Sequence, residues 1–245
     1  NLSTILRGIY ETGLSSRVEI ADKVGLDQAT VTRAVQKLVE KGIVFESILS
    51  KQEGQRGRRS IGLQLSTNLY RFVIVRLQRL SFKVALIDLT GNILEETEHA
   101  IDALQKPVHI FDMIVQETEK NFADCSEAIL GMGLTLPGPY LEQSERILLM
   151  TGGPDWQEFD LVHRLREHFS NIPLYSKHDA KAAALSVWKT QGVLEDSKVM
   201  LYLSAGQGIG AGLVINGEVF RGSQGIAGEI GHTSIKKDGP QCYCG

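Results

Sequence analysis

Residues 16–44 read SRVEIADKVGLDQATVTRAVQKLVEKGIV, and this stretch predicts a helix-turn-helix. Ser16 and Glu19, three residues apart, form a capping box that would begin the first helix. Gly25 would end that helix in a left-handed backbone conformation, and Asp27 would cap the next helix. Two short helices joined by a tight turn containing Gly are typical of the motif whose second helix enters the DNA major groove.

The second predicted helix, which would end near Gly42, has an apolar and a polar face. Its apolar residues recur at helical spacing and are Ala29, Val31, Ala34, Val35, Leu38 and Val39. The candidate DNA contacts on the polar face are Gln28, Thr30, Thr32 and Arg33. Gln pairs well with adenine, Arg with guanine, and Thr with the thymine methyl group or with phosphate. The alternative is an ordinary helical hairpin, whose solvated face needs no such residue choice.

Residues 43–66 predict a β-hairpin, which would complete a winged helix. Ile43–Ser47 is strand-like, and Ile61–Ser66 alternates apolar and polar residues as a half-buried strand does. The tip between them is rich in Gly and basic residues and carries Arg56, Arg58 and Arg59. These side chains would enter a narrow minor groove or hold phosphates. A solubilising loop is the alternative interpretation of the tip.

The composition is typical of a soluble globular protein, with 42% apolar and 22% charged residues among 245. No apolar run is long enough to span a membrane, and the N-terminus has no signal peptide, so neither export nor membrane insertion is expected. The three cysteines are too few for a disulfide framework and favour a reducing cytoplasm. Residues 1–66 carry ten Lys/Arg and seven Asp/Glu, whereas the rest is net acidic, as for a DNA-binding module attached to another domain.

The sequence predicts two domains, a winged helix-turn-helix at residues 1–66 and an α/β domain at residues 71–245. Strand-like runs and helical patterns alternate after residue 71, which favours an α/β core with a mixed sheet. The expected strands are 72–77, 82–89, 93–101, 128–135, 173–176, 199–203 and 213–215, and the expected helices are 108–122, 160–169 and 179–191.

Two patterns in the second domain carry chemistry. Ser204–Gly212, SAGQGIGAG, is a Gly-rich loop that would present backbone N–H groups to phosphate, or would form a tight hairpin. Glu229 and His232 could together hold sugar hydroxyls, hold a metal, or pair with each other. Cys242 and Cys244 follow, and two thiolates with a nearby His are ligands suited to Zn²⁺.

The chain resembles the ROK family of bacterial repressors and sugar kinases. The resemblance covers nearly the whole chain and rests on GMGLTLPGP at 131–139, HDAKAAAL at 178–185, GQGIGAGLVINGEVFRGSQGIAGEIGH at 206–232, and CYCG at 242–245. It implies an actin-like, hexokinase-like (ribonuclease H-like) fold for the second domain. The winged helix in front is similar to the repressor branch, which includes xylose and N-acetylglucosamine repressors.

The resemblance also implies site residues. A structural zinc would be held by His232, Cys242 and Cys244, with its fourth ligand beyond this sequence. The closing helices of the family are also missing, so the chain is expected to be truncated at its C-terminus. Asp179 matches the base of the family's kinases, and with Glu229 and His232 it is a candidate for sugar binding.

The phosphate-binding turn of the kinases should fall at Arg76–Leu80, where none of its residues is present. In the kinases two glycines of this turn let the backbone approach phosphate closely, and long side chains replace both of them here. No ATP binding and no enzyme activity are therefore expected. The favoured hypothesis is a cytoplasmic repressor of carbohydrate-use genes that binds double-stranded operator DNA and senses a small sugar. It would act as a homodimer or a dimer of dimers. The alternatives are an active sugar kinase with an added DNA module, and a regulator controlled by a sugar-transport protein.

Overall fold

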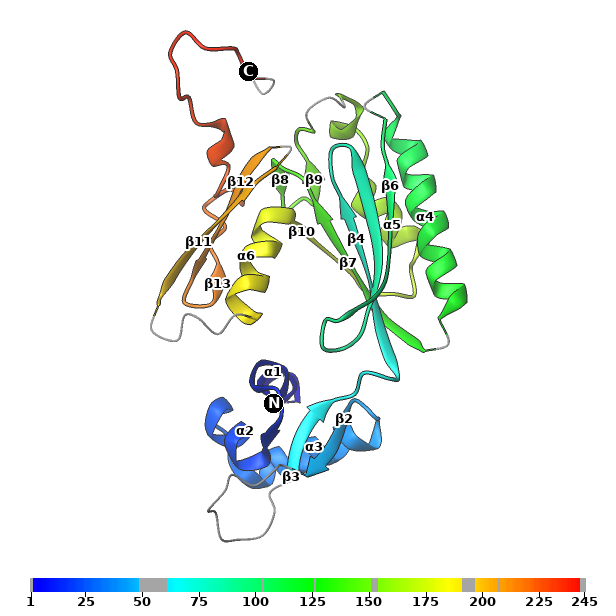
Figure 1. The fold of residues 1–245 in the computed structure, drawn as a ribbon, viewed down its shortest axis with the longest axis vertical. Coiled ribbons are helices and arrows are strands. Elements are labelled where there is room, and N and C mark those ends of the chain that lie inside the picture. The colour runs from blue at the N-terminus through cyan, green and yellow to red at the C-terminus, as the bar shows by residue number, and fades with distance from the viewer. Residues whose placement is uncertain are drawn as a thin grey trace. The chain divides into compact units, whose positions relative to one another are not determined.

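The structure, a computed structural model, describes residues 2–48, 61–102, 104–125, 127–150, 154–190, 197–206 and 208–242 (Figure 1). It divides the chain into two compact units, which are described separately. The first unit comprises Asn1–Arg71 together with Ile87–Asn92, and the second comprises Phe72–Leu86 with Ile93–Gly245. The grouping of the turn Ile87–Asn92 with the first unit was not expected from the sequence, because it joins two strands of the second domain.

The first unit is a winged helix. Its elements are α1 (Leu2–Thr12), β1 (Ser15–Ser16), α2 (Arg17–Val24), α3 (Gln28–Glu40), β2 (Val44–Ile48) and β3 (Ile61–Leu65). The three strands form one sheet in the order β1-β3-β2, with both pairings antiparallel. The helix-turn-helix and the two strands of the wing are therefore confirmed, whereas α1 and β1 were not predicted.

The helix ends of the first unit follow the local signals in the sequence. The Ser16 hydroxyl accepts a hydrogen bond from the Glu19 amide, and the Glu19 carboxylate accepts one from the Ser16 amide at 2.7 Å. Gly25 ends α2 with φ at +66°, which a residue with a side chain rarely adopts. The predicted capping box and C-cap are thus confirmed. Of the apolar residues predicted for α3, Val31, Val35 and Leu38 are buried, Ala34 and Val39 are partly buried against the same core, and Ala29 is exposed.

Apolar side chains from all three helices and the wing form the core of this unit. Its fully buried members are Ile5, Ile9, Ile20, Val31, Val35, Leu38, Val44 and Leu63. α1 contributes Ile5 and Ile9, whose spacing of four residues places them on one helical face. The helix-turn-helix therefore depends on α1 for much of its buried surface.

The second unit contains two larger sheets. Its first elements are β4 (Tyr70–Leu77), β5 (Ser81–Ile87), β6 (Ile93–Ala100), α4 (Pro107–Asp124), β7 (Ala128–Leu136), β8 (Tyr140–Leu141), β9 (Arg146–Ile147) and η1 (Pro154–Gln157). The chain continues with α5 (Leu161–His168), β10 (Leu174–His178), α6 (Asp179–Thr190), β11 (Val199–Ala205), β12 (Ile209–Ile215), β13 (Glu218–Val219) and η2 (Ile230–His232). One sheet has the order β10-β7-β4-β5-β6 and the other the order β11-β12-β13, so the expected α/β architecture is confirmed.

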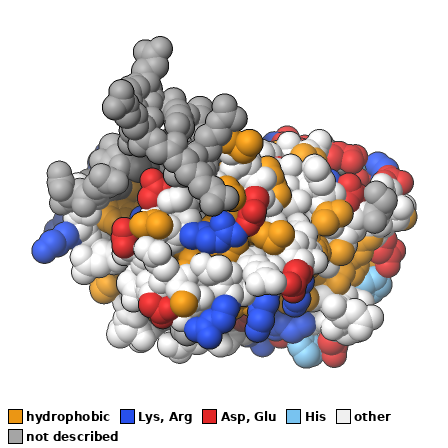
Figure 2. All heavy atoms as spheres, turned by 90° about the horizontal axis from the view of Figure 1, so that it is seen from below, with side chains coloured by type: hydrophobic (Ala, Val, Ile, Leu, Met, Phe, Trp, Pro, Cys, Tyr) orange, Lys and Arg blue, Asp and Glu red, His pale blue; other side chains and the backbone are white. Residues whose placement is uncertain are grey.

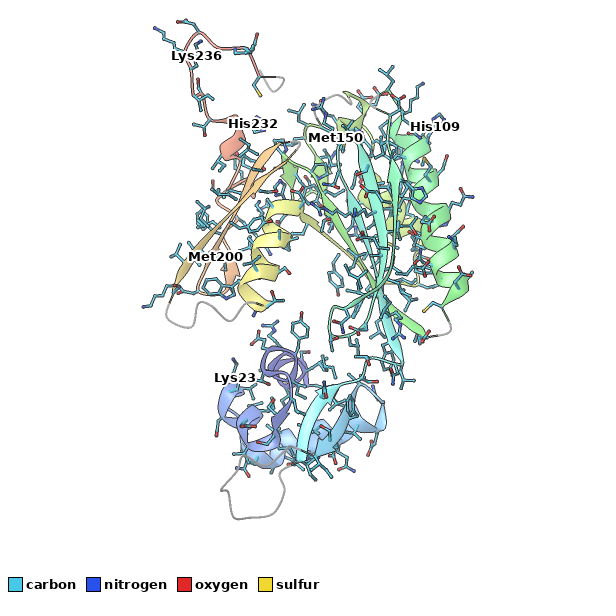
Figure 3. The ribbon with its side chains drawn as sticks, in the orientation of Figure 1. Lys23, His109, Met150, Met200, His232 and Lys236 are labelled. Atoms are coloured by element: carbon cyan, nitrogen blue, oxygen red, sulfur yellow. The ribbon has the colours of Figure 1, made fainter. Side chains whose placement is uncertain are left out.

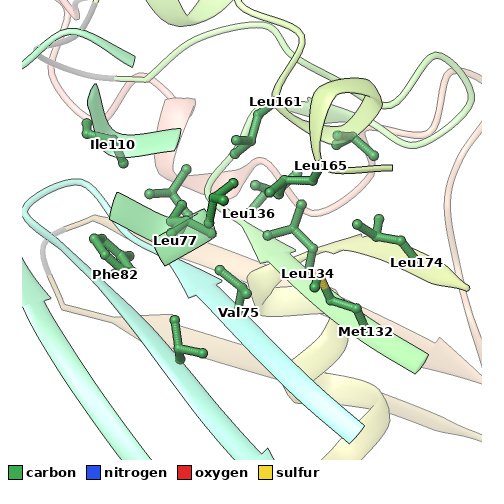
Figure 4. Close-up of a cluster of buried hydrophobic side chains, with 14 of the residues drawn as sticks. Val75, Leu77, Phe82, Ile110, Met132, Leu134, Leu136, Leu161, Leu165 and Leu174 are labelled. Carbon is green, nitrogen blue, oxygen red and sulfur yellow. The ribbon is translucent and has the colours of Figure 1, made fainter. Parts of the chain in front are cut away.

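The five-stranded sheet packs against α4 and α5. Figure 4 shows Val75 and Leu77 from β4, Phe82 from β5 and Leu134 from β7 facing Ile110 of α4 and Leu165 of α5. All of these side chains are buried. This core fixes β7 and β10, the two strands that end at the candidate ligand site. No helix in the described part of the chain is long and apolar enough to cross a membrane.

The Gly-rich stretch at 204–212 forms a tight hairpin between β11 and β12. β11 continues to Ala205 and β12 begins at Ile209, so most of the stretch pairs in the antiparallel β11–β12 ladder. Gly212 lies in β12 against α6, where a Cβ atom would come within 2.5 Å of the Ala184 Cβ. The glycine is thus required for close packing of the helix on the sheet. The predicted hairpin is thus confirmed, and phosphate binding by its backbone stays a prediction.

Candidate functional site

The exposed side of α3 carries uncharged polar and basic side chains. Gln28, Thr32, Arg33 and Lys37 are exposed along it. Val31, Val35 and Leu38 on the opposite side anchor the helix to the core, so the exposed side chains are presented from a fixed backbone. Figure 2 shows Lys and Arg side chains interspersed with Asp and Glu side chains on the face that it draws.

Thr30 differs from the other candidate DNA contacts because its hydroxyl is already engaged within the helix. It donates to the Asp27 carboxylate at 2.7 Å, and the Thr30 amide donates to the same carboxylate at 2.8 Å. These hydrogen bonds lower the pKa of Asp27, which keeps the cap ionised near neutral pH. Arg33 Nη2 lies 3.4 Å from Thr30 Oγ1, so Thr30 also orients Arg33 near the start of α3.

The wing is a regular antiparallel hairpin up to the ends of its strands. Val44 pairs with Leu65, and Ile48 pairs with Ile61. Arg17 of α2 forms an ion pair with Glu46 of β2, which links the helix-turn-helix to the wing. Arg56, Arg58 and Arg59, which the sequence places at the wing tip, lie outside the described residues.

A second candidate site lies in the α/β unit, where His178, Asp179 and Glu229 come together. His178 Nε2 is 3.6 Å from both Asp179 Oδ1 and Glu229 Oε1. The His178 side chain is buried, and its Nδ1 has no hydrogen-bond partner among the described residues. Gly138 faces the same group, since a Cβ atom there would overlap with His178 Nε2 and lie 2.9 Å from Glu229 Oε1.

The sheet explains why residues so distant in sequence meet here. β7 and β10 are parallel, and Leu136 at the end of β7 lies beside His178 at the end of β10. Gly138 comes two residues after the end of β7, and Asp179 begins α6 directly after β10. The site therefore lies at the carboxyl ends of parallel strands, the usual place for a ligand in an open α/β sheet.

Asp179 lies at the start of α6 and remains accessible to a ligand. Its Oδ1 accepts a hydrogen bond from the Ala180 amide at 2.6 Å, so it caps the start of α6. Its side chain is still 29% exposed, which leaves carboxylate surface accessible to a ligand. Glu229 is less exposed, at 19%, and lies just before η2. Carboxylates placed in this way are strong acceptors for sugar hydroxyl groups.

A polar network beside the site holds the segment that follows Gly138. Ser176 Oγ is 2.6 Å from the Tyr140 hydroxyl and donates to Glu145 at 2.9 Å. Both terminal nitrogens of Arg166 donate hydrogen bonds to the Glu145 carboxylate, at 2.6 and 2.8 Å. The Arg166 hydrogen bonds lower the pKa of Glu145, whereas burial raises the pKa of Tyr140 to about 12.

This network predicts an acid-dependent loss of stability. The pKa of Glu145 is lower in the folded state than in the unfolded state. Its contribution to the free energy of unfolding is therefore fully present above the unfolded-state pKa, and it is lost as pH falls through the folded-state pKa. The Glu145–Arg166 ion pair is partly exposed, so we expect it to contribute only about 0.5–1 kcal/mol to the free energy of unfolding. Urea unfolding at pH 7 and pH 4 should show a smaller acid loss in Glu145→Gln than in the wild type. An equal loss in both proteins would contradict the prediction, and Glu95→Gln on exposed β6 is the control.

His232 lies on η2, where Figure 3 labels it, and the Cys242 sulfur is 3.6 Å from its Nδ1. A tetrahedral zinc with ordinary Zn–N and Zn–S bonds separates such ligand atoms by roughly 3.5 Å. His232 and Cys242 therefore fit two adjacent positions around one ion. Cys244 lies outside the described residues. Within the part of the chain that is described, no three His, Cys, Asp or Glu side chains are arranged around a common metal position.

The sequence did not single out three residues of the ligand region. Gly138 contacts the site through its backbone, which no residue pattern reveals. His178 stands in the motif HDAKAAAL, where the sequence predicts a role only for its neighbour Asp179. Lys181 is buried beside the site, and a lone Lys in the Ala-rich stretch HDAKAAAL was the one available signal.

The turn between β4 and β5 is tight and carries long side chains. The Gln78 amide donates to the Ser81 carbonyl at 2.8 Å, which closes the turn. Leu80 is exposed on the turn, and Arg76 is exposed near the end of β4. This segment is the one where the sequence predicts that a kinase would hold phosphate.

A winged helix followed by an α/β domain with a polar site at its strand ends is the architecture of a DNA-binding protein with an attached ligand domain. Comparison with known proteins defines it further. The ROK family model matches residues 74–245, and a winged helix-turn-helix DNA-binding model matches residues 3–44. The chain therefore belongs to the ROK family.

Similar curated proteins are named as repressors. A putative xylose repressor from Caldicellulosiruptor sp. (strain Rt8B.4) is 32% identical over 248 residues, which cover all of this chain and 61% of that protein. The DNA-binding transcriptional dual regulator NagC from Escherichia coli (strain K12) is 28% identical over 249 residues, which cover all of this chain and 60% of that protein. The chain thus spans about three fifths of the length of these relatives.

Solved structures with the same fold include both regulators and kinases. A ROK family transcriptional regulator described as a homologue of the E. coli MLC protein matches the whole chain with a TM-score of 0.75 at 24% identity, over 63% of its own length. A ROK family glucokinase from Streptomyces griseus, solved with glucose and AMPPNP, matches with a TM-score of 0.62 at 22% identity. The match covers 71% of this chain and 54% of the glucokinase chain. At these identities the likeness shows the fold alone.

Proposed function

We propose that this chain is part of a DNA-binding transcriptional repressor of carbohydrate-use genes, whose ROK domain senses a sugar without phosphorylating it. The observation that carries the proposal is the combination of an exposed, basic and polar side of α3 with the His178, Asp179 and Glu229 site. The similarity to a putative xylose repressor and to the DNA-binding transcriptional dual regulator NagC supports the same class of function.

The DNA contacts that we propose are Gln28, Thr32 and Arg33 in the major groove, oriented in part through Thr30. Arg56, Arg58 and Arg59 would contact the minor groove or phosphates from the wing. Two copies in a dimer, or in a dimer of dimers, would place two such helices on the half-sites of a palindromic operator.

The sugar would bind through its hydroxyl groups to the carboxylates of Asp179 and Glu229, next to His178. Binding would favour one of the protein's conformations and so change the DNA affinity of the dimer. His232 could add a further contact through the ring nitrogen that does not face Cys242.

The long side chains at Arg76–Leu80 support a sensor without kinase activity, because they occupy the turn where phosphate would need glycines. A zinc ion would be held by His232, Cys242 and Cys244, with a fourth ligand from outside this sequence. The 3.6 Å separation of the first two ligand atoms supports this. Such an ion would stabilise the segment after η2 and would take no part in chemistry.

Two measurements test the proposal. Selection from a random-sequence DNA library should enrich one sequence with two related half-sites, and no enrichment would contradict DNA recognition. Thermal unfolding with D-xylose, D-glucose or N-acetylglucosamine, each with and without Mg-ATP, should show stabilisation by one sugar and no further effect of ATP. Product formation with ATP would identify a kinase, and no response to any sugar would favour control by a protein partner.

Glu229→Gln should remove about half or more of the stabilisation by the effective sugar. A ligand at a hundredfold over its Kd stabilises the folded state by about 2.7 kcal/mol. A neutral amide accepts hydroxyl hydrogen bonds less strongly than a carboxylate, so we expect about a tenfold or greater loss of affinity. The matched control is Glu218→Gln on exposed β13. An unchanged sugar response in Glu229→Gln would remove Glu229 from the site.

A further inference from the structure

Lys181 is the most deeply buried charged residue among those described, with 1% of its surface exposed. It lies on α6, two residues after Asp179. A buried ammonium group is unfavourable unless its donors are paired. Lys181 Nζ donates to the Gly225 carbonyl oxygen, and Glu142 Oε1 lies 4.0 Å away. Burial lowers the pKa of Lys181, while the carboxylates of Glu142 and Glu229 oppose that shift.

Gly225 belongs to the segment that leads from β13 to Glu229. The segment closes on itself through a backbone hydrogen bond of 3.1 Å from the Ala227 amide to the Arg221 carbonyl. Gly225 is buried within it, with φ at +80°. Among the side-chain hydrogen bonds of the described residues, the one from Lys181 joins this segment to α6.

Glu142 holds the same segment at a second point. Its Oε2 is 3.3 Å from Arg221 Nε and 3.7 Å from Lys177 Nζ, and its side chain is 9% exposed. The buried carboxylate thus lies among three cations from β10, α6 and the start of the segment. Glu142 thus contacts the segment at Arg221, and Lys181 contacts it at Gly225, which is four residues before Glu229.

We propose that Lys181 is a positioning residue for the ligand site, because its hydrogen bond to Gly225 fixes residues 221–229 and so places the Glu229 carboxylate opposite His178 and Asp179. Glu229 has no covalent neighbour in the five-stranded sheet, so its place depends on how this segment is held. Lys181 holds it at Gly225, and the hydrogen bond from the Ala211 amide of β12 to the Gly228 carbonyl holds it beside Glu229. The inference rests on the proposed function, in which Glu229 binds a sugar.

The test compares Lys181→Met, which removes the ammonium group, with Lys181→Gln, whose amide can still donate to Gly225. Lys189→Met is the matched control, since it removes the same charge from an exposed position of the same helix. The first readout is amide hydrogen exchange of peptides covering residues 221–229, measured without any sugar. We expect exchange about tenfold faster in Lys181→Met, partial recovery in Lys181→Gln, and wild-type exchange in Lys189→Met.

The second readout is the affinity for D-xylose, D-glucose and N-acetylglucosamine, titrated well below the unfolding temperature so that all variants are folded. We expect about a tenfold weaker affinity in Lys181→Met for whichever sugar binds the wild type, with a smaller loss in Lys181→Gln. Should Lys181→Met fail to fold, Lys181→Gln decides both readouts.

The outcomes separate the two claims. Unchanged exchange at 221–229 overturns the positioning role, whatever the sugars do. Faster exchange with unchanged sugar affinity overturns the link from this segment to Glu229. If the wild type binds none of the three sugars, the sugar-sensing proposal fails, and faster exchange in Lys181→Met still supports the hold of Lys181 on the segment.

Discussion

Replacing Arg33 by alanine should lower affinity for the selected operator about tenfold to a hundredfold and relax base preference at one position. Arg33 is exposed on α3, and its guanidinium group lies 3.4 Å from Thr30 Oγ1 near the start of the helix. An Arg that reads guanine through two hydrogen bonds contributes about 1–3 kcal/mol of discrimination against other bases. Fluorescence anisotropy on the operator and its single-base variants, at one fixed salt concentration, measures both effects.

The matched control is Arg7→Ala, which removes the same charge from the exposed side of α1. It should weaken binding to all DNA sequences equally, if it weakens binding at all, because a charge lost away from the bases changes only the salt-dependent term. A uniform loss in Arg33→Ala, with base preference intact, would place Arg33 on phosphate. No loss at all would mean that α3 is not the recognition helix.

Gly228→Ala should destabilise the second unit by about 2–5 kcal/mol and abolish sugar binding with it. Gly228 has φ at +98°, which side chains disfavour, and a Cβ atom there would overlap with the Ala211 carbonyl oxygen. That oxygen cannot move aside easily, because β12 is held at the same point by the hydrogen bond from the Ala211 amide to the Gly228 carbonyl at 3.0 Å. Glu229 follows directly and would be displaced.

Urea unfolding followed by circular dichroism measures the change in free energy, and sugar titration measures the loss of binding. Gly208→Ala is the matched control, since a Cβ atom at Gly208 has no described atom within 4 Å and φ there is not positive. We expect it to stay near wild-type stability. Comparable stability of the two variants would contradict the packing of Gly228 on β12.

The two units differ in how far their structures could be predicted. In the winged helix the signals are local: Ser16 and Glu19 begin α2, Gly25 ends it, and Asp27 begins α3. Each cap satisfies backbone groups within a few residues of itself, so the pattern survives whatever surrounds it. α1 escaped prediction because it has no side-chain cap signal and is held by Ile5 and Ile9 in a core shared with the other helices.

By itself, the sequence determined the caps of the helix-turn-helix, the alternation of strands and helices, and the family, because these depend on local hydrogen bonding and residue order. Only the tertiary structure decided the ligand site. Gly138, His178 and Glu229 meet because parallel pairing of β7 with β10 aligns their ends, and because a segment held by Lys181 returns to them. Contacts between distant segments depend on packing and strand register, which no local pattern encodes.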